Sequence, residues 1–175
     1  LRARGFFRTV FFIPAVLPTV TIGVVGNWLF SPSRGFVNEL WLLLGGVRVN
    51  FGMSPSHIMP MLLTMAFWQF MGNHAVFLIA GMSGIEPSLL EAALVDGATA
   101  WQRARYIILP LLRPVFAYIS ITAAAGSLVV YELPFIMLSP GGSPGGPAGR
   151  GWFFIPYIAW LAFDQFRMGF ATAVG

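Results

Sequence analysis

Long apolar runs without charged side chains alternate along this chain with short polar or glycine-rich segments. The first run extends from Thr9 to Phe30 and the second from Ile58 to Met82. A helix needs about 20 mostly apolar residues to cross the hydrocarbon core of a bilayer. Each run therefore predicts a membrane-spanning helix, and Pro14 and Pro18 are expected to kink the first one.

A third apolar run follows the polar middle of the chain. It begins around Ile107 or Pro114 and ends near Leu138. This run predicts a third span, which carries the carboxylate of Glu132 near its far end. An acid within a span is costly and usually faces a partner or a water-filled cavity.

Three shorter segments complete the pattern. Phe36–Leu44 predicts a short helix that lies along the membrane interface, and the glycine-rich run Gly141–Pro147 predicts a loop. Trp152–Gly175 predicts an interfacial stretch followed by the beginning of a further span. The expected fold is all-α, a polytopic transmembrane helical bundle with about three complete spans and the start of another.

Composition supports a membrane protein and excludes several other classes. The chain is 57% hydrophobic and only 9% charged, whereas a soluble domain is about 25% charged. The basic residues are ten scattered arginines, which do not form the clustered face of a nucleic-acid-binding protein. With no cysteine, and with His57, His74 and the acids dispersed, neither a metal site nor a catalytic group is expected. No cofactor is expected, and the chain is not expected to be an enzyme.

The arginines also suggest an orientation, because cytoplasmic loops hold an excess of basic residues. Placing the polar segment Ser83–Tyr106 in the cytoplasm puts six arginines inside and four outside. The inside set is Arg2, Arg4, Arg8, Arg103, Arg105 and Arg113, and the outside set is Arg34, Arg48, Arg150 and Arg167.

The polar segment predicts two helices joined at a glycine. Ser88, with Glu91 three residues later, has the spacing of a capping box. Gly97 suits the left-handed position that ends a helix. Thr99, with Gln102, repeats the capping-box spacing and opens a second helix, which prolines interrupt further on. A plain re-entrant or connecting helix between two spans is the alternative interpretation.

The same segment contains a more specific pattern. Glu91-Ala92-Ala93, then Gly97 after three residues, then Ile107-Ile108-Leu109-Pro110 after nine more, resembles the EAA motif of binding-protein-dependent ABC importer permeases. The triplet Asp96-Gly97-Ala98 and Trp101 resemble the carbohydrate-type subgroup.

Weaker matches to that subgroup flank the motif along the rest of the chain. Two features depart from its pattern: Glu132 stands where Asp is commoner, and the loop from Ser139 to Gly151 lacks an expected threonine-containing pattern. The flanking matches are Arg8-Thr9 with Phe12, Pro14 and Leu17-Pro18, then Trp68 through Leu78-Ile79-Ala80-Gly81, Tyr131-Glu132, and Gly169-Phe170-Ala171-Thr172-Ala173.

The resemblance implies one ABC-type permease domain over residues 1–175, incomplete at both ends, with a cytoplasmic coupling loop at 83–106. It implies a subunit of an ATP-driven importer in the bacterial cytoplasmic membrane, for a sugar or a related polyol or glycerol-phosphate solute. The implied partners are a dimer of ATP-binding subunits, a second permease subunit, an extracellular solute-binding protein and the lipid bilayer. The implied ATPase-coupling residues are Glu91, Ala92, Ala93, Asp96, Gly97, Leu109 and Pro110.

The chain itself lacks a phosphate-binding loop motif, so ATP hydrolysis is assigned to a separate subunit. An amino-acid or peptide ABC permease is the nearest alternative, and an ion-coupled carrier is a more distant one. Polar groups within the apolar runs are candidates for the solute path: Gln69, Asn73, His74, Tyr131 and Glu132. Hydrogen bonds between helices are an alternative role for Asn73 and His74, and an interfacial position is an alternative for Glu132.

Overall fold

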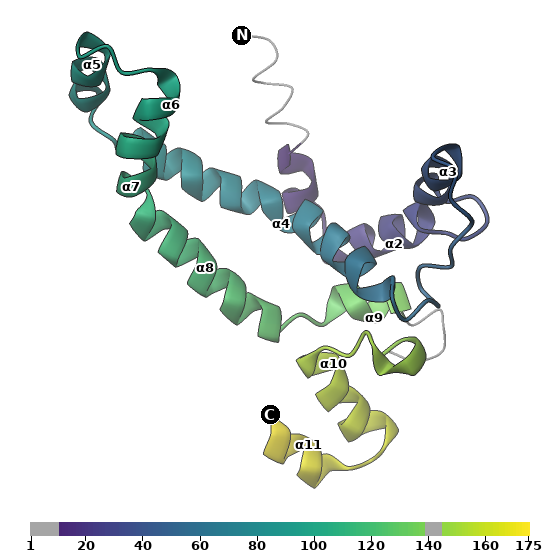
Figure 1. Ribbon diagram of the computed structural model, residues 1–175. Coiled ribbons are helices and arrows are strands. Elements are labelled where there is room, and N and C mark those ends of the chain that lie inside the picture. Colours follow the sequence, from purple (N-terminus) through teal and green to yellow (C-terminus); the bar gives the residue numbers. More distant parts are fainter. Residues whose placement is uncertain (1–10, 139–144) are drawn as a thin grey trace.

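The computed structural model describes residues 11–138 and 145–175 (Figure 1), and within these ranges every regular element is helical, which confirms the all-α prediction. The helices are α2 (Thr19–Leu29), α3 (Phe36–Leu43), α4 (Ile58–Ser83), α5 (Pro87–Val95), α6 (Ala100–Arg103), α7 (Leu109–Leu111), α8 (Arg113–Leu128), α9 (Glu132–Leu138), α10 (Phe154–Ala159) and α11 (Met168–Val174), with π-helical turns η1 (Ala104–Ile108) and η4 (Trp160–Asp164) and a 3₁₀ turn η3 (Pro147–Gly149).

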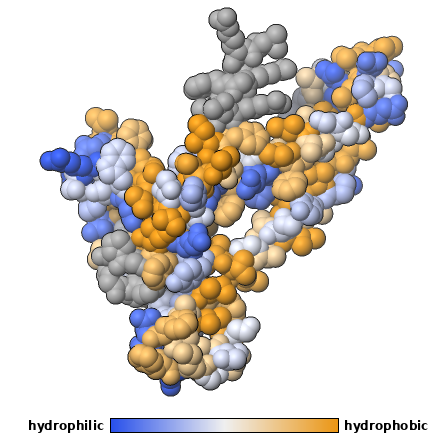
Figure 2. Space-filling view, turned by 180° about the vertical axis from the view of Figure 1, so that it is seen from behind, coloured by the Kyte–Doolittle hydropathy of each residue, from blue (hydrophilic) through white to orange (hydrophobic). Residues whose placement is uncertain are grey.

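Helix α4 is the long axis of the molecule and matches the second predicted span. Its 26 residues extend about 39 Å at 1.5 Å per residue, enough to cross a hydrocarbon core of about 30 Å. Only 22% of its most apolar stretch is buried, so α4 is not the enclosed core helix of a soluble protein. Figure 2 shows hydrophilic surface gathered at the end with α5 and α6 and at the opposite end near α3.

The first predicted span is not one continuous helix. Residues 11–16 are helical, the helix is interrupted at Leu17 and Pro18, and α2 begins at Thr19. Pro18 lacks an N–H group and disfavours a helical conformation in the residue before it. The prolines therefore interrupt this run, while the start of the predicted span, residues 9–10, lies outside the described ranges.

The third predicted span is also divided, and its expected end at Leu138 is wrong. The helix bends by 61° between α7 and α8, α8 ends at Leu128, and α9 is a separate helix. Pro134 explains the second break, because a helix continued through it would lose one hydrogen bond and clash with the preceding turn. In the first turn of α9 that missing N–H costs nothing.

Helix α9 turns back and packs against α2, and α4 completes this core. A Cβ atom on Gly23 would lie 2.8 Å from Ile136 Cγ2, so the small residue lets the two helices approach closely. Asn27 Nδ2 of α2 donates to the Ile136 carbonyl oxygen at 2.9 Å. The buried core side chains come from α2, α4 and α9 and from the residue directly after α2: Ile22, Phe30, Ile58, Met61, Leu62, Met65, Leu133, Met137 and Leu138.

Helix α3 corresponds to the predicted interfacial helix, and one buried side chain ties it to its flanking loops. Asn38 is fully buried; its Nδ2 donates to the carbonyl oxygens of Ser31 at 3.0 Å and Val49 at 2.9 Å. Its Oδ1 accepts from the Val49 N–H at 2.9 Å. Nearby, Arg48 pairs with Glu39 at 2.7 Å. Asn38 thus links the two irregular segments of chain that flank α3.

We expect Asn38→Leu to lower the free energy of unfolding by about 3 kcal/mol, because three hydrogen bonds of about 1 kcal/mol each are lost. The measurement is a thermal unfolding curve in detergent. Asn50→Leu is the matched control, since the exposed Asn50 side chain has no hydrogen bond to another described residue. An equal shift in both variants would contradict this role for Asn38.

The C-terminal segment, predicted as an interfacial stretch and the start of a span, is made of short helices. Helix α10 continues into η4, the chain turns at Phe166 with a positive φ of 52°, and α11 follows. Trp152, Tyr157 and Trp160 form an aromatic cluster at its beginning. Most of the predicted loop at 141–147 lies outside the described residues, and a further span beyond α11 stays a prediction.

Candidate functional site

The first candidate site is the head segment, residues 86–111, which stands at one end of α4 (Figure 1). Its helix α5 begins at Pro87, and Glu86 occupies the N-cap position without a side-chain capping bond. The predicted N-cap at Ser88 is therefore wrong. Proline is favoured at the first helical position, where its missing N–H is not needed, and this places Ser88 inside the first turn.

Gly97 takes the left-handed conformation that ends α5, as predicted from the sequence. This residue has φ +78°, and a Cβ atom added there would meet nothing within 4 Å. The N–H of Gly97 donates to the Leu94 carbonyl oxygen at 3.0 Å, and the N–H of Ala98 donates to that of Ala93 at 2.9 Å. These two bonds form a Schellman motif, which ends the helix and fixes the direction of the chain after it.

The second predicted capping box is confirmed. The Thr99 side chain accepts from the Gln102 N–H at 3.3 Å, and Gln102 Oε1 accepts from the Thr99 N–H at 2.7 Å. Helix α6 starts there and passes through η1 into α7. The two helices α5 and α6 are therefore joined by a short turn in which both helix ends are capped.

The head segment meets α8 at a bend that we call the elbow, centred on Leu112. Leu109 and Pro110 lie in α7, directly before it. Leu112 is buried, and a Cβ atom on Gly81 near the end of α4 would lie 2.9 Å from Leu112 Cδ2 and 2.8 Å from Val115 Cγ2. The elbow therefore packs directly against α4 and joins the head segment to α8.

The predicted coupling residues are distributed over this segment in two ways. Ala93 is buried, whereas the other residues of α5 and its end that were predicted face solvent: Glu91, Ala92, Asp96 and Gly97. Leu94 and Val95 also expose 53% and 89% of their surface. The head segment thus presents an apolar and acidic surface away from the rest of the chain.

The second candidate site is a pocket of about 320 Å³ between α4 and α8. Asn73 and His74 of α4, both predicted as solute-path residues, line it. Neither side chain forms a hydrogen bond within the described part of the chain. Thr122 and Ser127 of α8 line the opposite wall. The remaining walls are apolar or aromatic: Leu62, Leu63, Ala66, Phe70, Phe77, Ala123, Gly126, Val130, Leu133, Pro134 and Phe153.

The other three predicted solute-path residues do not line this pocket. Gln69 is buried and donates from Nε2 to Thr19 Oγ1 of α2 at 2.9 Å. Tyr131 stacks on Phe135 with ring centroids 5.3 Å apart. Glu132 is exposed in the first turn of α9, so its predicted position near the end of a continuous span is wrong.

Sequence reasoning missed Thr122 and Ser127, although a signal for them exists. The run Thr122-Ala-Ala-Ala-Gly-Ser127 combines small residues and hydroxyls within an apolar helix. Small residues leave room beside a helix, and hydroxyls in lipid surroundings need a partner. Such a run therefore indicates a cavity or a helix contact.

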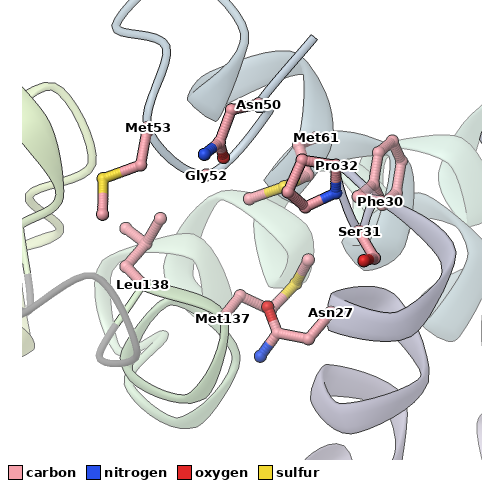
Figure 3. Close-up of a pocket in the computed structure, with 10 residues that line it drawn as sticks. All are labelled: Asn27, Phe30, Ser31, Pro32, Asn50, Gly52, Met53, Met61, Met137 and Leu138. Carbon is pink, nitrogen blue, oxygen red and sulfur yellow. The ribbon is translucent and has the colours of Figure 1, made fainter. Parts of the chain in front are cut away.

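A third recess lies at the end of α4 opposite the head segment, with a volume of about 340 Å³. Asn27 of α2 and Asn50 of the loop before α4 lie on opposite sides of it in Figure 3. Three methionine side chains also line it, including those of Met61 and Met137. None of these residues was singled out from the sequence.

Comparison with known proteins identifies the class of this chain. It belongs to the family of binding-protein-dependent transport system inner membrane components, whose sequence profile matches residues 2–162. It is therefore a membrane-located transport component. The family assignment agrees with the resemblance carried by Glu91-Ala92-Ala93 and Gly97.

Individual relatives agree along nearly the whole chain. The arabinooligosaccharides transport system permease protein of Halalkalibacterium halodurans is 29% identical over 176 residues, covering 100% of this chain and 54% of the relative. The trehalose/maltose transport system permease protein of Thermococcus litoralis is 30% identical over 169 residues, covering 97% of this chain and 54% of the relative. The chain thus spans about half the length of these relatives.

A solved structure shares the fold. It is the crystal structure of a bacterial alginate ABC transporter in complex with an alginate pentasaccharide-bound periplasmic protein. The TM-score is 0.86 at 27% sequence identity, and the match covers 99% of this chain and 59% of that chain. The helical arrangement described above is therefore that of an ABC transporter permease.

Proposed function

We propose that this chain is the membrane-spanning permease subunit of an ATP-driven importer for a sugar, most specifically an oligosaccharide. Its proposed partners are a dimer of ATP-binding subunits, a second permease subunit and an extracellular solute-binding protein. Support comes from the family assignment and from the relatives, whose names give arabinooligosaccharides and trehalose or maltose as cargo. No relative named above favours an amino-acid or peptide permease.

The head segment is the observation that carries this proposal. Helix α5 ends in a Schellman motif, α6 begins with a capping box, and the elbow packs on α4. We infer that the head segment, which is capped at this joint, moves as one rigid body. We infer that an ATP-binding subunit holds α5, with Glu91 and Asp96 pairing at the surface and Ala92 allowing close approach. Leu109 and Pro110 pass the displacement to α8.

The pocket between α4 and α8 is the proposed solute path. Its amide, imidazole and hydroxyl groups, on Asn73, His74, Thr122 and Ser127, are of the kind that hydrogen-bonds sugar hydroxyls. The rings of Phe70 and Phe77 give it apolar surface as well. Because α8 carries one wall and continues from the elbow, motion of the head segment changes the width of this pocket.

The proposed orientation places the head segment in the cytoplasm of a bacterial cell and the Asn27–Asn50 recess outside. Arg103, Arg105 and Arg113 lie at or near the elbow end, and basic residues favour the cytoplasmic side. The outer recess then lies on the side from which a solute-binding protein delivers its cargo.

A crosslinking experiment tests the proposed partner and orientation together. These 175 residues contain no cysteine, so Ala92→Cys adds one thiol to this part of the protein, on the exposed surface of α5. We expect this thiol to crosslink to a co-expressed ATP-binding subunit and to react with a membrane-impermeant maleimide only in inside-out vesicles. The readouts are a shifted band on a gel and the extent of labelling.

Ser33→Cys is the matched control, because Ser33 is exposed near α3 at the opposite end. It is expected to label from outside the cell and to give no crosslink. Labelling of Ala92→Cys from outside, or an absence of crosslinks to any ATPase, would overturn the proposed function.

A further inference from the structure

The exposed side of the elbow has a groove whose two arginines have no assigned role in coupling or in the solute path. It is open, has a volume of about 520 Å³, and bridges the bend from η1 to the first turn of α8. Two arginines line it from the two sides of the bend, which we call its arms: Arg105 in η1 and Arg113 in α8. The lining residues are Arg105, Tyr106, Leu109, Pro110, Arg113 and Phe116.

Neither arginine of the groove has a carboxylate partner within the described residues. The one ion pair among the described residues joins Arg48 to Glu39, far from the elbow. Within the described part of the chain, Arg105 and Arg113 therefore face one recess with no acidic side chain paired to them. Arg113 is also the first residue of α8, where the helix dipole adds to the positive potential.

The contact between the elbow and α4 determines the level of the groove across the membrane. Gly81, at the third-last position of α4, lies against Leu112 and Val115. Helix α4 extends about 39 Å, while the hydrocarbon core is about 30 Å thick and the whole bilayer is about 40–45 Å thick. With α4 centred across the bilayer, its last turn, and the elbow with it, lies at the level of the lipid headgroups.

The wall of the groove suits that level. Tyr106, Leu109 and Phe116 expose 71%, 54% and 40% of their surface. Tyrosine is enriched where headgroups meet acyl chains, and Leu109 and Phe116 add apolar surface beside Tyr106. Leu109 and Phe116 therefore offer apolar contact for the first part of an acyl chain beside the two arginines.

We propose that this groove binds the phosphate headgroup of an anionic phospholipid. The guanidinium groups of Arg105 and Arg113 donate hydrogen bonds to phosphate oxygens, for which their planar geometry is well matched. The first part of the acyl chains lies over Leu109 and Phe116. Because the arginines belong to opposite arms, one bound phosphate links both sides of the elbow. That the lipid comes from the cytoplasmic leaflet rests on the proposed orientation; the groove and its charge do not.

Lipid titration monitored by native mass spectrometry tests this proposal. The protein is purified from membranes in neutral detergent with its accompanying subunits, and phosphatidylglycerol or phosphatidylcholine with identical acyl chains is added. We expect tighter binding of phosphatidylglycerol. In Arg105→Gln/Arg113→Gln its affinity falls about 25-fold, at about fivefold for each basic residue near a membrane surface, while phosphatidylcholine binding is unchanged. Both arginines lie at the surface of the groove, so neutral replacements remove charge without opening a cavity.

Arg34→Gln/Arg150→Gln is the control, because it removes two exposed arginines from positions outside the groove. It is expected to keep the full preference for phosphatidylglycerol. Three results would overturn the proposal. They are an unchanged preference in the elbow variant, displacement of the lipid by millimolar inorganic phosphate, and loss of an associated ATP-binding subunit in the elbow variant with lipid preference retained. The second result would indicate a free-anion site and the third a protein contact.

Discussion

Replacing Gly97 with leucine is expected to reduce solute uptake about a hundredfold while the protein stays inserted and the ATP-binding subunits continue to hydrolyse ATP. Gly97 has φ +78°, a conformation that costs an L-residue roughly 1–2 kcal/mol. Leucine will therefore push the chain out of this conformation and break the Schellman bonds to Ala93 and Leu94. The direction from α5 to α6 then changes, and an error of about 1 Å in a working geometry can cost about a hundredfold in rate.

A second glycine provides a matched control for this experiment. Gly45 follows α3 at the opposite end of the molecule, has φ +84°, and likewise has nothing within 4 Å of an added Cβ atom. Gly45→Leu carries the same local strain but does not touch the head segment. Uptake of radiolabelled sugar and ATPase activity, measured in proteoliposomes, separate the two variants. Equal loss of uptake in both variants, or normal uptake in Gly97→Leu, would contradict a coupling role.

The parts of the head segment that were correctly predicted depend on local chemistry. Thr99 and Gln102 satisfy each other's backbone groups within one turn, and Gly97 supplies a conformation that other residues avoid. Such signals need no tertiary contact. Ser88 was wrong for an equally local reason: Pro87 competes for the start of the same helix, and the proline determined where α5 begins.

Errors in the predicted spans have a different origin. Hydropathy measures how apolar a run is, but it does not show where the helix stops. The run from Pro114 to Leu138 has only one charged residue, Glu132, yet the chain leaves the helix between α8 and α9, and α9 packs on α2. That packing depends on the complementary surfaces of Gly23 and Ile136, which lie far apart in the sequence. Because of this break, the predicted position of Glu132 near the end of a continuous span was wrong as well.

The solute-path candidates show the same limit at the level of single residues. Gln69 and Asn73 lie four residues apart and therefore on one side of α4. The sequence predicts that both are polar groups in an apolar helix, but not which neighbour each meets. Gln69 meets Thr19 of α2, whereas Asn73 lines the pocket facing α8. This difference depends on how α2 and α8 cross α4.

Filling the pocket between α4 and α8 is expected to have the second large effect. In Ala123→Phe, a phenyl ring enters a space of about 320 Å³ and competes with the solute for it. A steric misfit in a binding pocket costs up to about 3 kcal/mol, so the concentration of sugar needed for half-maximal uptake should rise about a hundredfold. The fold should survive, because α8 has no buried residue along the described length and neighbouring Gly126 has open space beside it.

Ala124→Phe is the control for the filled pocket, because Ala124 is the next residue along α8, is exposed as Ala123 is, and does not line the pocket. The two variants gain the same ring at adjacent positions, about 100° apart around the helix. A general effect of bulk on α8 would weaken uptake in both, whereas occlusion of the solute path would weaken it only in Ala123→Phe. The basal ATPase activity is expected to be normal in both, since neither residue touches the head segment. Unchanged sugar dependence in Ala123→Phe would remove this pocket from the transport path and leave the coupling role of Gly97 untouched.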